Sequence, residues 1–143
     1  ILSGNFADKN AGTGKAVSLA LTGAAGANYI ITPVDGITAD ITPRALTITA
    51  LPGGVANRVY NAGTATSVSF ANDRIYGDIL TTGYGSAAFE DKNVGTGKTV
   101  NVSGITLGGA DAGNYTYSTT ATATASITRL NVALQGVTAA NKV

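Results

Sequence analysis

Residues 91–100 read DKNVGTGKTV, and residues 8–17 read DKNAGTGKAV. The later copy resembles the end of a phosphate-binding P-loop. A P-loop has a further glycine five positions before its second glycine, and it opens a helix whose first N–H groups hold the phosphate. Position 92 is a lysine instead, and residues 98–103 alternate polar and apolar types, the period of a half-buried strand. The stretch therefore predicts a strand next to a glycine turn and no nucleotide site.

The copy at 8–17 supports this interpretation. There Ala16 replaces the hydroxyl residue that would hold Mg²⁺ in a P-loop, whereas the glycines and the lysine remain. Glycine adopts positive φ without steric cost, which tight turns between strands require. We therefore expect four glycines to serve as structural turn residues: Gly12, Gly14, Gly95 and Gly97.

Two copies of one decapeptide indicate an internal repeat. The Asp-Lys-Asn copies lie 83 residues apart, Tyr29 and Tyr115 lie 86 apart, and the Ala-Asn pairs at 56–57 and 140–141 lie 84 apart. The repeat is thus about 85 residues long. The chain reads as an excerpt from a tandem array. We expect residues 1–43 to be the C-terminal part of one repeat, 44–128 a complete repeat and 129–143 the start of the next.

Composition excludes several classes of function. The 143 residues contain no Cys, His, Met or Trp, which excludes disulfides, thiol or imidazole catalysis and Cys/His zinc sites. Charged residues make up 12% of the chain and the net charge is +1. The chain therefore lacks the basic patch that would attract nucleic acid or an anionic membrane. No apolar run is long enough to insert into a membrane. We expect any export signal to lie upstream of Ile1.

Short alternating stretches separated by turn residues predict an all-β fold. No window shows helical periodicity. About seven short strands per repeat favour tandem small β-sandwich modules of the immunoglobulin-like type, and β-grasp-like modules are the alternative topology. The stretches are 46–49, 68–70, 87–89, 100–102, 115–117 and 121–128.

The stretch GADAGNYTY at 109–117 carries a second structural signal. An aspartate four residues before a tyrosine resembles the corner of immunoglobulin-like domains, in which the tyrosine hydroxyl bonds to nearby backbone. The earlier copy keeps Tyr29 but has Ala25 in place of Asp111. A buried tyrosine that follows a glycine turn is the equally good alternative. Both interpretations make Tyr29 and Tyr115 core residues.

No pattern supports catalysis. The adjacent carboxylates Glu90 and Asp91 would point to opposite faces of a strand, and their copy reads Ala7-Asp8. We therefore expect no enzyme, no catalytic residue and no cofactor.

Two further kinds of site, for calcium and for a covalent crosslink, find little support in the sequence. Calcium at Asp73, Asp78 or Asp111 would need a loop that supplies more oxygens, and none is present, so we expect no metal. Lys92 or Lys98 could form an isopeptide crosslink if buried beside a carboxylate, but exposed turn lysines are the simpler interpretation. The glycan-acceptor patterns at 101–103 and 114–116 are short enough to occur by chance.

The stretch from Phe89 to Tyr115, FEDKNVGTGKTVNVSGITLGGADAGNY, is followed by an Ala/Thr-rich strand and Ser-Ile-Thr. It resembles the YDG/MBG-type repeat modules of very large bacterial secreted proteins, which include haemagglutinin-like adhesins exported by two-partner secretion. Those modules usually read Tyr-Asp-Gly where this sequence has Tyr60-Asn61-Ala62. The resemblance implies an extracellular stalk or spacer module at the bacterial cell surface, without catalytic residues.

Two functions remain open. The repeats form either a structural stalk, matrix or fibre, or a ligand-binding module, for example for a glycan. Tyr76 and Tyr84 are the candidate ligand contacts, because the other aromatic residues mostly fall at core positions of strands. The partners we expect are neighbouring repeats, and other copies that pair through uncovered sheet edges. Leu130, Val132 and Leu134 are expected to form the first strand of the next repeat.

Overall fold

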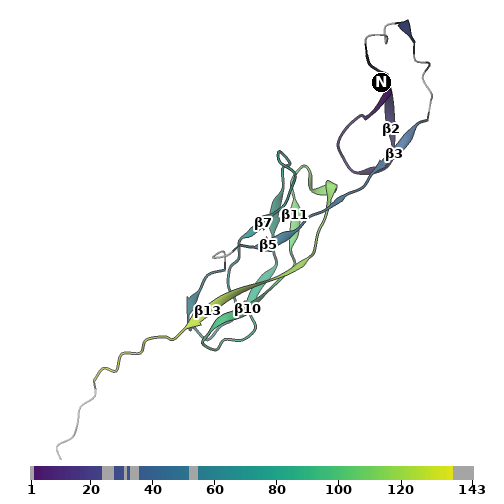
Figure 1. Ribbon diagram of the computed structural model, residues 1–143. Coiled ribbons are helices and arrows are strands. Elements are labelled where there is room, and N and C mark those ends of the chain that lie inside the picture. The colour runs from purple at the N-terminus through teal and green to yellow at the C-terminus, as the bar shows by residue number, and fades with distance from the viewer. Residues whose placement is uncertain (1, 24–27, 31, 33–35, 52–54, 137–143) are drawn as a thin grey trace, which may run out of the picture. The chain divides into compact units, whose positions relative to one another are not determined.

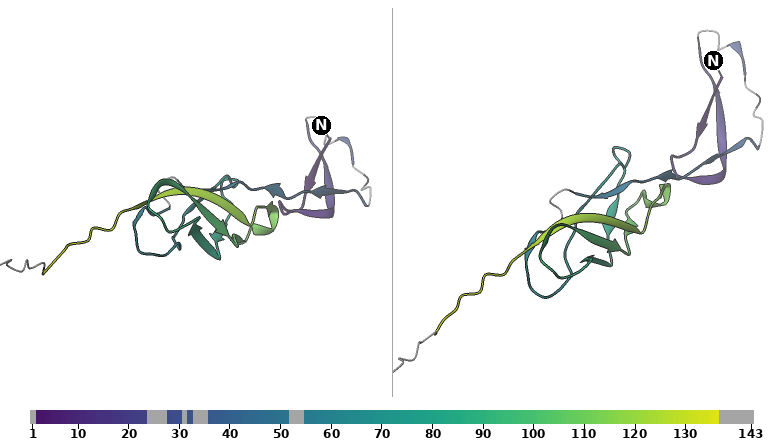
Figure 2. Two further views of the ribbon diagram at one scale, coloured as in Figure 1. Left: turned by 90° about the horizontal axis from the view of Figure 1, so that it is seen from below. Right: turned by 60° about the horizontal axis from the view of Figure 1, so that its bottom comes forward.

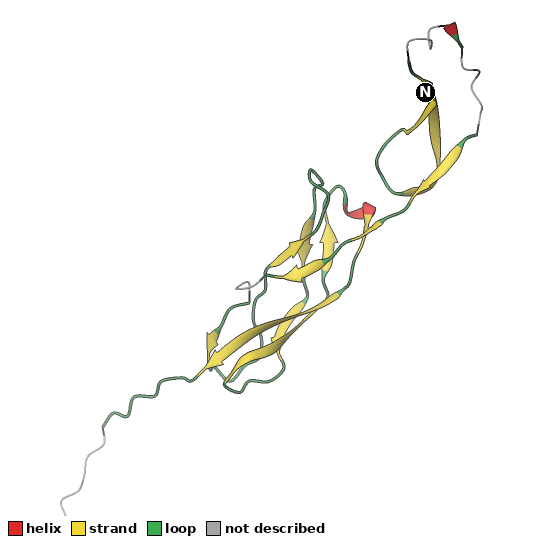
Figure 3. Cartoon of the chain, viewed as in Figure 1, coloured by secondary structure: helices red, strands yellow, loops and turns green. Residues whose placement is uncertain are grey.

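The computed structural model describes residues 2–23, 28–30, 32, 36–51 and 55–136 (Figure 1). These residues form strands and no α-helix, so the prediction of an all-β fold is confirmed. Figure 3 draws the strands in yellow, and residues 112–114, drawn as helix, are a short 3-10 turn. None of the described residues belongs to a helix that could cross a membrane. Ala25, the Pro-Gly-Gly break at 52–54 and residues 137–143 of the predicted next repeat lie outside the described residues.

Most of the strands are short, and a 3-10 turn, η2 (Ala112–Asn114), precedes the last two. The strands are β1 (Leu2–Phe6), β2 (Gly12–Leu21), β3 (Thr38–Ile41), β4 (Arg44–Ala45), β5 (Ile48–Ala50), β6 (Arg58–Val59), β7 (Phe70–Asn72), β8 (Thr81–Gly83), β9 (Ser86–Phe89), β10 (Gly95–Ser103), β11 (Thr106–Gly108), β12 (Tyr115–Thr116) and β13 (Thr120–Thr128).

The chain forms two compact groups of residues, and each group combines three separate segments. The first contains 1–48, 72–82 and 106–118, and the second contains 49–71, 83–105 and 119–143. Strands that are far apart in the sequence therefore meet inside each group.

In the first group, β1, β2 and β3 form an antiparallel sheet in that order, and two further pairs are β11–β8 and the parallel pair β4–β12. Its core is small. Leu46, Leu80 and Tyr115 are buried together, and Ile48, Leu107 and Ala112 pack against them. Tyr115 thus lies in the core, at the position where β12 follows η2.

The second group contains a four-stranded sheet in the order β6-β13-β10-β9, and β5 pairs with β7. The long strands β10 and β13 lie side by side, which both views of Figure 2 show. Val100 and Val102 are buried and Asn101 is exposed, so the alternation read from the sequence marks the inner face of β10. The buried residues of this group are Val55, Val68, Ala87, Phe89, Val100, Val102, Ile105, Ala125 and Ile127.

The two decapeptide copies have the same local structure. Phe6 pairs with Val17 in β1–β2, and Phe89 pairs with Val100 in β9–β10, each 83 residues later. On the other side Gly12 pairs with Ile41, and Gly95 with Ile127. The register shifts in both copies between the first glycine and the lysine three positions on.

That register shift corrects the prediction of glycine turns. The turn between β9 and β10 is formed by residues 90–94, whereas Gly95 and Gly97 already belong to β10. Gly14 and Gly97 have φ of 59° and 61°, so the expected left-handed conformation occurs at a bulge inside the strand. A glycine is favoured there because a side chain would be strained in that conformation.

The prediction of a first strand at Leu130, Val132 and Leu134 is wrong. The described residues 129–136 form no strand, and these three side chains are largely exposed. Leu46, which precedes Leu130 by 84 residues, is buried because Leu80 and Tyr115 cover it. Alternation of apolar residues does not make a strand where no partner strand or covering core is present.

Candidate functional site

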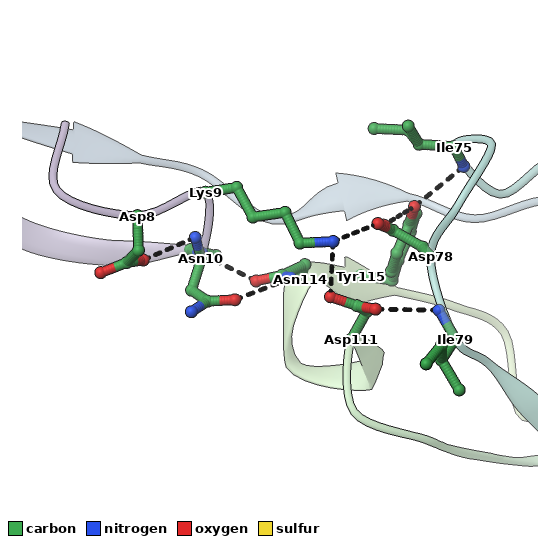
Figure 4. A network of polar contacts seen from close by, with 10 residues as sticks. Asp8, Lys9, Asn10, Ile75, Asp78, Ile79, Asp111, Asn114 and Tyr115 are labelled. Carbon is green, nitrogen blue, oxygen red and sulfur yellow. Dashed lines mark hydrogen bonds and ion pairs between the residues drawn. The ribbon is translucent and has the colours of Figure 1, made fainter. Parts of the chain in front are cut away.

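The most organised polar site in the described residues is a cluster in the first group, around Lys9 (Figure 4). The Lys9 ammonium nitrogen lies 2.5 Å from a carboxylate oxygen of Asp78 and 2.8 Å from one of Asp111. The two carboxylates are nearly buried, with side-chain exposures of 8% and 11%, whereas Lys9 itself is 61% exposed. The lysine therefore lies over a recessed pair of acids.

A second contact lies beside the first. The Asn114 side-chain amide nitrogen donates to Oδ1 of Asn10 at 3.2 Å, and Oδ1 of Asn114 accepts from the backbone N–H of Ala11 at 2.8 Å. Asn114 ends η2, directly before the buried Tyr115. Lys9, Asn10 and Ala11 are consecutive, so one short turn makes every contact on its side of the cluster.

Each carboxylate also accepts a hydrogen bond from a group other than Lys9. The hydroxyl of Tyr115 donates to Oδ2 of Asp78 at 2.6 Å and accepts from the Ile75 N–H at 3.0 Å. Oδ2 of Asp111 accepts from the Ile79 N–H at 2.8 Å. One oxygen of each acid is thus fixed by neighbouring residues, and the other is left for the lysine.

These contacts correct the predicted tyrosine corner. The Tyr115 hydroxyl does not bond to backbone near it in the sequence. It holds the 75–78 loop, 40 residues earlier, to the core. The general idea of a tyrosine that fixes a loop remains, but the loop is a different one.

The electrostatics follow from the contacts. The pKa of Asp78 is lowered mainly by the hydrogen bond from Lys9, and to a lesser extent by the one from Tyr115. The backbone hydrogen bond of Ile79, then Lys9, lowers the pKa of Asp111. The two carboxylates raise the pKa of Lys9. All three groups are therefore charged at neutral pH.

Both decapeptide copies carry a further ion pair. Lys15 bonds to Asp8, and Nζ of Lys98 lies 2.8 Å from Asp91. In each copy the aspartate also accepts from the N–H two residues on, which closes the turn. Glu90 lies 3.6 Å from Lys98, so Glu90 and Asp91 both face one lysine and do not point to opposite sides as predicted. The reason is that they follow β9 in a turn.

The other predicted site residues are dispersed. Tyr29 is 68% exposed, so its prediction as a core residue is wrong. Its counterpart Tyr115 is buried because it packs with Leu46 and Leu80, and no such cluster surrounds Tyr29 among the described residues. Tyr76 is fully exposed, whereas Tyr84 is half-buried against the Phe70 ring.

The candidate calcium ligands are used otherwise. Asp73 pairs with Arg44 and accepts from the Thr47 N–H, and Asp78 and Asp111 hold Lys9. No group of three potential metal-binding side chains occurs in the part of the chain that the structure describes. A cavity of about 280 Å³ adjoins the cluster, with Ile75, Tyr115 and Arg44 among its lining residues.

The cluster is not predicted by the sequence, in which the Asp-Lys-Asn stretch indicates a turn and Asp78 and Asp111 stand as independent acids. Lys9 and Asp78 are 69 residues apart, and no local pattern links residues at that distance. The recurrence of Lys-Asn in both copies, where a turn alone does not need a lysine, was the available signal.

A family model described as the YDG domain matches residues 42–125, more than half of the chain. The chain belongs to the YDG domain family. No curated protein and no solved structure matches it. Asp78, Asp111, Asn114 and Tyr115 lie inside the YDG domain, whereas Lys9 to Ala11 precede it.

Tyr60-Asn61-Ala62 stands where the resemblance led us to expect Tyr-Asp-Gly. Ala62 has φ of 65° and is the one non-glycine with positive φ among the described residues. The Asn61 side chain accepts from the Gly63 N–H, as an aspartate at this position could. Arg58 spans the same loop: it donates to the carbonyl oxygens of Ala65 and Gly63 and lies over the Phe89 ring.

Proposed function

We propose that this chain is a stretch of structural repeats from the extracellular stalk, fibre or matrix of a bacterial surface adhesin. In this proposal each YDG domain is a small β-sandwich, and the domains follow one another in tandem. The absence of an α-helix from the described residues supports a sandwich over a β-grasp arrangement, which packs a helix on its sheet. The chain acts by spacing and joining domains, with no chemical reaction.

The observation that carries the proposal is the cluster around Lys9. Its lysine and asparagine belong to the copy at 8–17, and its acids and Asn114 belong to the following YDG domain. A lysine that pairs with two recessed carboxylates, with further hydrogen bonds beside it, holds two elements in a defined geometry. Such a connection suits a spacer, because it limits bending where one repeat passes into the next.

The stalk proposal is tested on arrays of increasing length. Small-angle X-ray scattering of natural arrays with two, three and four repeats should give a maximum dimension that grows in proportion to the number of repeats. A dimension that stays nearly constant would mean that the repeats collapse on one another, and the spacer function would be wrong.

The location is tested separately. Antibodies raised against this chain should label intact cells that produce the full-length protein, and brief protease treatment of those cells should remove the label. Labelling only after permeabilisation would contradict an extracellular role.

One observation favours glycan binding as the second candidate function. Tyr76 is fully exposed beside Ile75, which is also largely exposed, on a loop that the Tyr115 hydroxyl fixes. An exposed aromatic ring on a fixed loop can stack on a sugar ring. Saturation-transfer NMR with a panel of oligosaccharides tests it: a signal lost in Tyr76→Ala and kept in Tyr84→Phe would favour binding over spacing.

A further inference from the structure

We propose that Lys92 and Asn93 form a docking surface for the YDG domain that follows this one, and that they enter that domain's counterpart of the Asp78, Asp111 and Asn114 cluster. The inference rests on the proposed tandem function and names the residues that make its joints. Each repeat would then carry both halves of a joint: a Lys-Asn pair for the next domain and an acidic recess for the previous one.

The first support is that Lys92 and Asn93 copy a pair already seen in contact. Lys9 and Asn10 precede them by 83 residues, and both turns are closed by the same aspartate–backbone bond and the same aspartate–lysine ion pair. The second glycine of each copy has the same left-handed φ. The turn that presents Lys92 thus has the local geometry of the turn that presents Lys9.

The second support is that this later pair is free. Lys92 and Asn93 are exposed, and neither side chain has a hydrogen-bond or ion-pair partner within the described ranges. The neighbouring Val94 is 45% exposed, although its counterpart Ala11 lines the cavity beside Tyr115. A lysine, an amide and an apolar side chain therefore lie together and uncovered, in the same order as in the turn that is docked.

The third support is where the chain leaves the sheet. Gly12 pairs with Ile41, and β4, the first strand of the YDG domain, begins at Arg44. Gly95 pairs with Ile127 in the same register, and the chain continues through Arg129 to Leu130. Leu46 follows Ile41 by five residues and its counterpart Leu130 follows Ile127 by three, so a domain that starts there would begin within a few residues of the same strand end.

The recess needs no rearrangement to receive a lysine. Tyr115 and the Ile79 N–H hold one oxygen of each carboxylate from within the domain, and the remaining oxygens face the ammonium group. Two recessed negative charges attract a single cation more strongly than an exposed pair does. The same recess in a following domain would select Lys92 by charge, and Asn93 would fix its orientation.

The test uses a chain in which residues 1–128 continue into a second copy of residues 43–128, with only the second copy isotope-labelled. In this chain Lys92→Ala should shift the NMR signals of the second copy's Asn114 side chain and Ile79 N–H, and it should make the two domains tumble more independently. Lys92→Arg should keep most of the wild-type signals, because the positive charge remains. In the original 143-residue chain, Lys92→Ala should change nothing beyond its own turn.

A double-mutant cycle identifies the partner. Once both aspartates of the second copy are changed to asparagine, Lys92→Ala should have no additional effect. Unchanged second-copy signals in Lys92→Ala, with the second copy folded, would overturn the proposal, as would an effect of equal size in the original chain. If arrays of repeats still lengthen in proportion to the number of repeats, the spacer function stands even though this joint is rejected. The failure of the joint is therefore distinguishable from the failure of the spacer function.

Discussion

Gly109 lies directly against the backbone of Ile79: a Cβ atom on Gly109 would come within 2.3 Å of the Ile79 carbonyl oxygen. Gly109 also has φ of 105°, a conformation that side chains rarely adopt. The same Ile79 carbonyl accepts from the Asp111 N–H. This close approach therefore places Asp111 next to the segment that carries Asp78, and the acidic recess depends on it.

Gly109→Ala should lower the free energy of unfolding by about 2–4 kcal/mol, because contact and φ are both incompatible with a side chain. Gly113→Ala is the matched control: no atom lies within 4 Å of its Cβ position, and its change should stay within about 0.5 kcal/mol. Urea unfolding followed by circular dichroism measures both. Equal stabilities for the two variants would contradict the close approach.

Ala62→Gly should stabilise the domain. An L-residue in the left-handed region costs about 1–2 kcal/mol, and the added freedom of glycine in the unfolded chain offsets part of that, which leaves a gain of about 0.5–1 kcal/mol. Ala65→Gly is the control, because Ala65 pairs with Ala88 in an extended bridge and glycine there should destabilise. Differential scanning calorimetry should show melting temperatures that move in opposite directions.

Gly97→Val should cost about 1 kcal/mol or more, since a β-branched residue is strained at φ of 61°, and Gly97→Asn should cost less. ATP with Mg²⁺ should leave the melting temperature of the wild-type chain unchanged. A saturable rise with nucleotide concentration would restore the P-loop interpretation.

Stability should fall on the acid side. Folding lowers the pKa of Asp78 and Asp111, so their contribution is complete above the unfolded value of about 4 and is lost as the pH falls through their folded pKa. Folding raises the pKa of Lys9, so its contribution persists until the pH rises through that higher value. Urea midpoints measured from pH 3 to pH 9 should therefore be flat near neutrality and decrease below about pH 4.

The Lys9→Met variant distinguishes the contribution of the Lys9 cluster to the acid-side loss of stability from the contribution of the other carboxylates. Without the ammonium group the two recessed acids repel each other, and the pKa of at least one of them rises. The acid-side loss of stability should then become shallower than in the wild type. Parallel curves for the two proteins would show that the acid sensitivity arises elsewhere.

No lysine should be crosslinked to an aspartate. The ion pairs lower the pKa of Asp8 and of Asp91 and raise that of Lys98, so these acids are ionised and the amine is protonated. An ammonium group has no free electron pair with which to attack a carboxyl carbon. The intact mass should equal the sequence mass, and a deficit of one water per pair would contradict this.

The sequence predicted the parts of the fold that depend on neighbours in the chain. Alternation at Val100 and Val102 identified the inner face of β10, and the repeated decapeptide identified two turns that proved alike. The sequence did not predict the features that depend on residues far apart in the chain. The exposure of Tyr29 and of Leu130 depends on covering residues, and the position of Lys9 depends on acids that come 69 and 102 residues later. The bulge was missed because a glycine pair in a strand and one in a turn have the same sequence signature.

The parallel pairing of β4 with β12 has a mechanical consequence. The chain enters the YDG domain through β4, and tension on its N-terminal side pulls this strand backwards along its own axis. Tension on the C-terminal side reaches β12 through β13, which follows it in the chain, and pulls β12 forwards, so β4 and β12 are loaded in opposite directions along their common length. Arg44 and Ala45 lie opposite Tyr115 and Thr116, and the Leu46 N–H donates to the Thr116 carbonyl at 2.7 Å. Such a pair is sheared and its bonds must break together, whereas an antiparallel hairpin pulled at its open end breaks them one at a time.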